Sequence, residues 1–143
     1  MRGHPFSPMQ TKEIPGYIIG SVHETDRHAH IQTMQSSLPG LQYVEAVYPA
    51  YEKVPFLSSI KDKSFERTGH ALSNGELGCL LSHRSVWRKI IKADVDPDQL
   101  FLILESDSAL ANLSLLEAKF STVVGNYDLF FWGGWEGHMK LLR

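Results

Sequence analysis

The fold is decided by the stretch Leu100-Phe101-Leu102-Ile103-Leu104, which is followed at once by Glu105-Ser106-Asp107. An unbroken apolar run of this length predicts a central β-strand that is buried on both faces of a sheet. In an open α/β sheet, ligands bind at the carboxyl ends of such strands. Carboxylates at that position suit a hard divalent cation and the phosphates that it carries. The alternative is that Glu105 and Asp107 cap the next helix, because Asp and Ser are favoured N-cap residues.

The size and composition of the chain predict one globular domain. Its 143 residues are enough to bury a core, and 43% hydrophobic and 21% charged residues are typical of globular proteins. A net charge of −2 excludes the basic surface expected of a nucleic-acid-binding protein. We expect residues 1–13, which are polar and contain prolines, to be a flexible leader, and residues 14–143 to be the single domain.

The cysteine count and the lengths of the apolar runs indicate in which cellular compartment the protein is expected. The single Cys79 excludes an internal disulfide, and no Cys/His cluster has zinc-site spacing along the chain. No apolar run reaches the ~18 residues of a membrane-spanning helix, and Pro5 and Pro8 interrupt the region where a signal peptide would be apolar. We therefore expect a cytoplasmic protein without a transmembrane segment, at most peripheral at the membrane.

Strand and helix patterns alternate along the chain. The apolar run Tyr17-Ile18-Ile19, flanked by glycines, predicts a first strand, and residues 41–47 predict a second. Helices are predicted over 24–37, 74–92 (with Asn74 as N-cap) and 113–124, and a further strand over 127–132. Residues 49–74 lack a clear period and predict a long irregular connection. The alternation predicts βαβ units, and therefore a mainly parallel sheet with helices on both faces.

The helix predicted over 74–92 has polar residues on its apolar side. A helical wheel places Glu76 and His83 within the apolar arc and four polar residues opposite it. The arc contains Cys79, Leu80, Val86, Trp87 and Ile90, and the opposite side contains Ser82, Ser85, Lys89 and Lys92. An unpartnered polar group in such an arc costs about 1–3 kcal/mol. His83 is thus either a hydrogen-bonded structural residue or a site residue, and Glu76 is more simply structural. Gly75 and Gly78 permit close approach of another backbone or a ligand.

Three motifs occur in the second half of the chain. They are Gly75-Glu76-Leu77-Gly78-Cys79-Leu80-Leu81-Ser82-His83, Leu102-Ile103-Leu104-Glu105-Ser106-Asp107 and Tyr127-Asp128-Leu129-Phe130-Phe131-Trp132-Gly133-Gly134. Together they resemble the motifs of glycosyltransferase family 25, which includes bacterial lipooligosaccharide galactosyltransferases and collagen galactosyltransferase domains. The similarity extends from about Gly16 to Gly134.

The resemblance implies a GT-A-like, Rossmann-like α/β domain that binds a nucleotide-sugar. Such an enzyme would transfer a hexose, most often galactose, from a UDP-sugar to a cell-surface glycan such as lipooligosaccharide, with inversion. In this fold, acidic residues after a central strand hold Mn²⁺ or Mg²⁺, which bridges the donor diphosphate. By position, Glu105 and Asp107 would be the metal ligands, with Glu105 on metal-bound water or the ribose.

The resemblance also assigns donor contacts elsewhere. The chain after Ile19 would approach the nucleotide, with Gly20 and Ser21 where the family usually has Asn and Leu. Arg27, from an Asp-Arg pair that the family keeps, would contact phosphate, although an exposed Arg on a helix is more often only solvated. The remaining donor contacts would be Gly75 and Glu76.

An inverting transfer needs a general base that deprotonates the acceptor hydroxyl. Glu136, in a glycine-flanked loop after a predicted strand, is one candidate, and His83 is another. His138 is a further candidate as base or metal ligand. Trp132 and Trp135 could stack on a sugar ring or belong to the core. The Gly/Trp/Glu loop is at least as often a plain connection.

Two departures from the family pattern leave alternatives open. Ser106 stands where the family has Asp, and the chain ends at Arg143, earlier than in typical members. The protein is therefore either a short transferase or a non-catalytic relative that binds nucleotide-sugar or a protein. A more distant alternative is a phosphatase-like or response-regulator-like α/β domain. An incomplete sheet would also leave an exposed edge, which favours a homo-oligomer.

Overall fold

The structure is a computed structural model that describes residues 14–123. The elements in chain order are β1 (Gly16–Gly20), the 3-10 helix η2 (Thr25–Arg27), α1 (His28–Ser37), β2 (Leu41–Glu45), α2 (Leu57–Thr68), α3 (Asn74–Lys92), β3 (Leu102–Glu105) and α4 (Leu113–Val123). The predicted leader over 1–13 and the predicted strand over 127–132 lie outside the described residues. Among the described helices, none combines the length and the apolar character that crossing a bilayer requires.

The described strands form a parallel sheet with the order β2-β1-β3. All five residues of β1 are buried, whereas β3 buries only Leu102 completely. Among the described residues, β1 is the central strand and β3 lies at an edge. The strand predicted over 127–132 lies outside these residues, so a central position for the strand predicted at 100–104 stays a prediction. The apolar run begins two residues before the strand, which starts at Leu102. Phe101, just before the strand, stacks on Tyr17 with 6.0 Å between ring centroids. Glu105 then becomes the last residue of β3.

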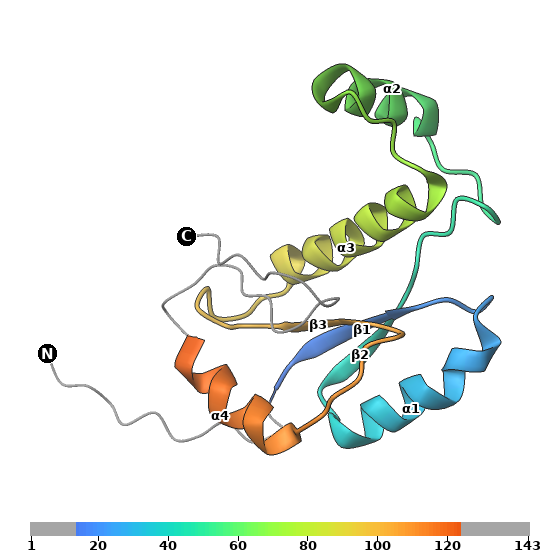
Figure 1. Cartoon of the computed structure of the whole chain (residues 1–143). Coiled ribbons are helices and arrows are strands. Elements are labelled where there is room, and N and C mark those ends of the chain that lie inside the picture. The colour runs from blue at the N-terminus through green and yellow to red at the C-terminus, as the bar shows by residue number, and fades with distance from the viewer. Residues whose placement is uncertain (1–13, 124–143) are drawn as a thin grey trace, which may run out of the picture.

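Helices cover both faces of the sheet (Figure 1). On one face, Met34 of α1 and Phe120 of α4 pack in a buried cluster with Ile18 of β1. On the other face, Val86 of α3 packs with Ile19 of β1 and with residues of β2 and β3. These two cores confirm the predicted α/β class, a Rossmann-like parallel sheet between helices.

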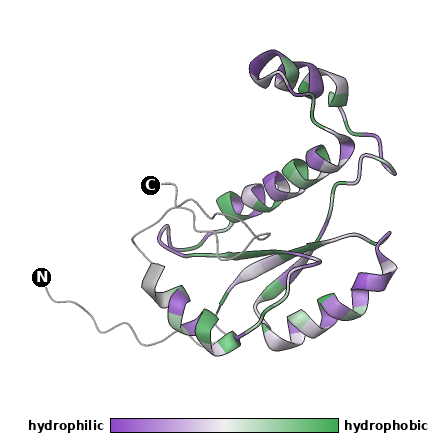
Figure 2. Cartoon of the chain, viewed as in Figure 1, coloured by the Kyte–Doolittle hydropathy of each residue, from purple (hydrophilic) through white to green (hydrophobic). Residues whose placement is uncertain are grey.

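The connection over 49–74 was predicted to be irregular, and this prediction is wrong because it contains α2. No residue of α2 is buried, and of its half-buried residues only Leu57 and Ile60 are apolar. This apolar pattern is too short for a periodicity argument to detect the helix. The helix stands away from the sheet in Figure 1, and Figure 2 shows mostly polar residues along it. It ends at Gly69, whose φ of 72° and N–H bond to the Phe65 carbonyl form a left-handed C-cap.

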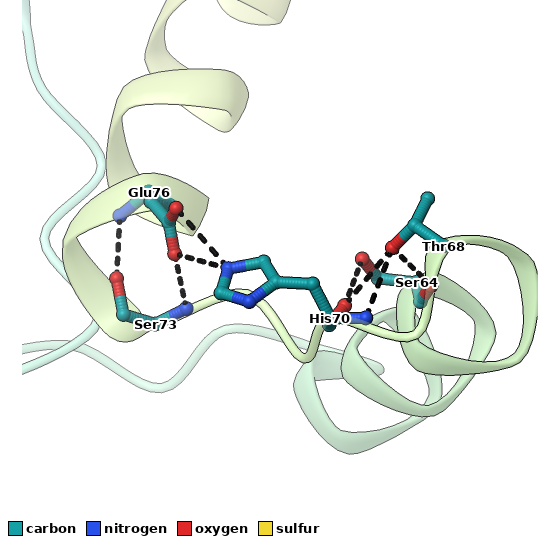
Figure 3. A network of polar contacts seen from close by, with 5 residues as sticks. All are labelled: Ser64, Thr68, His70, Ser73 and Glu76. Carbon is teal, nitrogen blue, oxygen red and sulfur yellow. Dashed lines mark hydrogen bonds and ion pairs between the residues drawn. The ribbon is translucent and has the colours of Figure 1, made fainter.

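Helix α3 begins at Asn74, and its N-cap lies one residue earlier than predicted. Its N-cap is Ser73, not Asn74, because Ser73 Oγ accepts the Glu76 N–H at 3.2 Å while the Glu76 carboxylate accepts the Ser73 N–H at 2.8 Å. His70 Nε2 lies 3.3 Å from both carboxylate oxygens of Glu76, as Figure 3 shows. These contacts give Glu76 a structural role at the start of the helix.

The buried face of α3 differs from the predicted arc. Its buried residues are Leu77, Gly78, Ser82 and Val86, whereas Leu80 and Trp87 are each 43% exposed. Ser82 was placed on the polar side, yet its hydroxyl donates to the Gly78 carbonyl at 2.6 Å and accepts the Val47 N–H at 2.9 Å. The buried hydroxyl of Ser82 therefore has hydrogen-bond partners on both sides, and Ser82 packs against the segment at Val47 that follows β2.

Gly78 allows this close approach and Gly75 does not take part in it. A Cβ added at Gly78 would lie 2.8 Å from the Val47 carbonyl oxygen, and backbone there cannot simply move aside. At Gly75 the nearest atom would be Ser73 Oγ at 3.9 Å. Of the two glycines that the sequence singled out, Gly78 meets another backbone and Gly75 faces open space.

Substitution by alanine should affect the stability of the fold differently at Gly78 and at Gly75. Gly78→Ala should lower the free energy of unfolding by about 1–3 kcal/mol, because the added methyl group overpacks the contact with Val47. Gly75→Ala should leave it unchanged or raise it by up to about 1 kcal/mol, because alanine favours helix. Urea unfolding followed by circular dichroism measures both. Equal stability of the two variants would contradict the close contact at Gly78.

Candidate functional site

The predicted site residues lie at one edge of the sheet, where the three parallel strands end. The register pairs Ile19 with Glu105 and Gly20 with Glu45, so the carboxyl ends of β1, β2 and β3 are adjacent. The segment 105–107 and the turn after β1 therefore face the same side of the molecule. This is the edge at which open α/β sheets bind ligands.

Arg27 links the two segments through a buried serine. Its Nη1 donates to Ser106 Oγ at 3.0 Å and lies 3.5 Å from Asp107 Oδ2. The Ser106 hydroxyl in turn donates to Glu24 Oε2 at 3.2 Å, and Ser106 is buried. A carboxylate at position 106 would place a second negative charge beside Glu24, so the hydroxyl suits this position. The structure thus gives a physical reason for the departure at Ser106.

The turn after β1 is tightly packed. Ser21 is fully buried, its hydroxyl accepts the His23 N–H at 3.2 Å, and its carbonyl accepts a hydrogen bond from His28 Nε2 at 3.0 Å. A Cβ at Gly20 would lie 2.6 Å from Ile31 Cδ1. These two predicted donor-contact residues therefore shape the turn, and the exposed part of the turn is Val22 and His23.

An aromatic cavity that the sequence did not reveal adjoins this turn. His23 and Tyr51 are stacked with 4.2 Å between ring centroids, and Tyr48 lies 5.0 Å from Tyr51. Together with residues at the end of β2 they line a cavity of about 510 Å³. Two tyrosines three positions apart, directly after a predicted strand, were the available signal. Only the fold brings His23 beside them.

A second cluster forms between α3 and the end of β3. Cys79 and His83 are one helical turn apart on α3, and both reach Glu105. His83 Nε2 lies 2.9 Å from Glu105 Oε1, and the Cys79 thiol donates to the same oxygen at 3.4 Å. The hydrogen bond from His83 is the largest cause that lowers the pKa of Glu105, whereas burial and then Glu105 raise the pKa of Cys79.

The remaining predicted residues have separate environments. Gly75 and Glu76 lie at the start of α3, where the Glu76 carboxylate is engaged by Ser73 and His70. The predicted general base Glu136 lies outside the described residues, as do His138, Trp132 and Trp135. The structure therefore joins His83 with Glu105 and Arg27 with Asp107.

The predicted Mn²⁺ or Mg²⁺ site requires oxygen ligands that converge. In the part of the chain that the structure describes, the potential ligands that converge are Cys79, His83 and Glu105, whose ligand atoms lie within 4.8 Å of one another. Asp107 is absent from this group and faces Arg27 instead. Glu105 and Asp107 thus have different partners, and a cation shared by these two carboxylates stays a prediction.

The fold and this edge define the class as an α/β domain with a polar site at the carboxyl ends of a parallel sheet. The sequence profile of glycosyltransferase family 25 (LPS biosynthesis protein) matches residues 13–136. The chain therefore belongs to glycosyltransferase family 25, a family of LPS biosynthesis glycosyltransferases. No curated protein and no solved structure matches it significantly.

The lowered pKa of Glu105 predicts a pH dependence of stability. Its folded pKa lies below the unfolded value, so the stabilisation is present above the unfolded pKa and is lost as the pH falls through the folded pKa. Below roughly pH 5, the unfolding free energy of the wild type should fall more steeply than that of Glu105→Gln. Urea unfolding at a series of pH values measures the two slopes.

The control for this comparison is Glu66→Gln, which removes the same charge from an exposed position on α2. It corrects for the change in net charge alone. Parallel slopes for the wild type and Glu105→Gln would contradict the interaction with His83.

Proposed function

We propose that this protein transfers a hexose, with galactose the first candidate, from a UDP-sugar to a glycan acceptor such as lipooligosaccharide, with inversion. The observation that carries the proposal is the juxtaposition of an aromatic cavity and an arginine along one sheet edge. The family supports glycosyl transfer in LPS biosynthesis. The donor and acceptor are our inference.

The cavity at the end of β2 suits a nucleobase. Tyr51 and Tyr48 offer aromatic faces on which a uracil ring can stack, and Glu52 and Glu45 in the lining offer hydrogen-bond acceptors. Stacking of a base on an aromatic side chain contributes about 1–3 kcal/mol. The base would therefore occupy the side of the edge formed by β1 and β2.

Arg27 suits the diphosphate at the other side of this edge. Its side chain is 36% exposed and is held toward β3 by Ser106 and Asp107. Neighbouring strands are roughly 4.8 Å apart, so the ends of β2 and β3 are separated by roughly 10 Å. This span is comparable with the length of a nucleoside diphosphate. A guanidinium at this point stabilises the negative charge that grows on the departing UDP.

The proposed reaction has a simple balance. The acceptor oxygen forms a bond to the anomeric carbon while the bond from that carbon to the UDP oxygen breaks. The acceptor proton goes to a general base, for which Glu136 stays the prediction. The Nε2 atom of His83 faces the Glu105 carboxylate, so His83 is less suited to accept that proton. A bound Mn²⁺ or Mg²⁺ would supply further neutralisation of the leaving diphosphate.

Substitution of Tyr51 tests the base site. Tyr51→Ala should weaken UDP binding roughly 5- to 150-fold, because the stacking surface is lost. Isothermal titration calorimetry of the purified chain with UDP measures this loss. Phe65→Ala is the matched control, since it removes an exposed aromatic ring from α2 that does not line the cavity.

Release of UDP from UDP-galactose in the presence of lipooligosaccharide then tests turnover. We expect release by the wild type and reduced release by the Tyr51 variant. Binding without release would instead favour the non-catalytic relative that binds nucleotide-sugar. Equal UDP affinity of the wild type and Tyr51→Ala would contradict the proposed donor site.

A further inference from the structure

We infer that Cys79, His83 and Glu105 form a Zn²⁺ site between α3 and β3. The inference is independent of the proposed transferase activity, because it depends only on the ligand atoms and their geometry. It also differs from the predicted cation site, in which Glu105 and Asp107 would share a hard ion.

The two elements bring three ligand atoms together. Cys79 and His83 lie at positions i and i+4 of a helix, so their side chains project from the same face. Glu105 is the last residue of the strand that packs beside this helix. The contacts between the three groups are 2.9 Å from His83 Nε2 to Glu105 Oε1 and 3.4 Å from Cys79 Sγ to the same oxygen, with all ligand atoms within 4.8 Å.

These separations are close to those of ligands around tetrahedral zinc. With bonds of about 2.0–2.3 Å, two ligand atoms of such a site lie roughly 3.3–3.8 Å apart. Small side-chain rotations would therefore admit the ion. Helix α3 packs on the sheet through Val86 and carries two of the ligands before the metal binds, and this preorganisation favours binding.

The ligand types select zinc over the hard cations. A thiolate and an imidazole suit Zn²⁺, whereas Mg²⁺ prefers oxygen ligands in octahedral geometry. Binding releases the thiol proton of Cys79 to solvent, and the proton of the neutral His83 ring moves from Nε2 to Nδ1 so that Nε2 can bind the ion. The resulting thiolate and the Glu105 carboxylate neutralise its charge. Each protein ligand contributes one bond, so the fourth tetrahedral position is left for water or for an oxygen of a substrate.

The Zn²⁺ site lies close to the network of Arg27 and Asp107. Glu105 is two residues from Asp107, whose carboxylate faces Arg27. If the proposed donor site is correct, the zinc lies beside the diphosphate position. The metal also ties α3 to the end of β3, so its binding should stabilise the fold.

Cobalt(II) is a direct probe of this site. The chain has one cysteine, so a thiolate-to-cobalt charge-transfer band can come only from Cys79. We expect Co²⁺ added to the metal-free full chain to produce this band and the intense visible bands of tetrahedral Co²⁺. Both should saturate at one equivalent and disappear when Zn²⁺ is added.

Variants identify the ligands. Cys79→Ser should abolish the charge-transfer band, and His83→Gln and Glu105→Gln should each weaken Zn²⁺ binding at least about 10-fold, measured by competition with a chromogenic chelator. His70→Gln, at an exposed histidine outside the cluster, and Asp107→Asn should leave Zn²⁺ binding unchanged. Circular dichroism of each variant reports whether it is folded.

Two results would overturn the inference. The first is absence of the charge-transfer band in the wild type, a result that needs no variant. The second is loss of Zn²⁺ binding in Asp107→Asn with retention in Cys79→Ser, which would place the cation on the predicted carboxylates. Neither result depends on UDP binding, so failure of the zinc site and failure of the donor site are distinguishable.

Discussion

The rest of the structure depends on the parallel pairing of β1 with a strand on each side. All of β1 is buried, and its register sets Ile19 beside Glu105 and Gly20 beside Glu45. Because all three strands run in the same direction, their polar ends meet at one edge while their apolar residues fill the cores above and below. The polar networks of the described residues lie at that edge for a topological reason, since the parallel pairing brings together the ends of three strands that are far apart in sequence.

Polar groups at the edge divide into two networks with different physical properties. One is built on Arg27, with the buried hydroxyl of Ser106 between the guanidinium and Glu24, and it supplies positive charge near an exposed carboxylate. The other joins a thiol and an imidazole of α3 to Glu105. Ser106 departs from the family pattern, which has Asp at this position. Its hydroxyl is nevertheless hydrogen-bonded to both Arg27 and Glu24, and it stabilises the position of Arg27.

The strands and most helices could be predicted because each has a buried apolar face that leaves a pattern in the sequence. Helix α2 could not, because none of its residues is fully covered and only two of its half-buried residues are apolar. The face of α3 was misplaced because Ser82 is a buried polar residue. The acidic residues after β3 were correctly expected at a strand end. The partners of these acidic residues were not predicted, since Cys79 and Glu105 are separated by most of α3, a loop and the rest of β3. Spacing rules detect only ligands that are near in sequence. His23 and Tyr51 escaped prediction for the same reason.

An amide NMR titration of the full chain with UDP tests whether the carboxyl ends of the three strands form the ligand site. We expect chemical-shift changes to concentrate in the turn after β1, in Tyr48–Glu52 after β2, and around Arg27 and Asp107. Changes confined to α2 and the outer face of α3, or no changes at all at millimolar UDP, would contradict it.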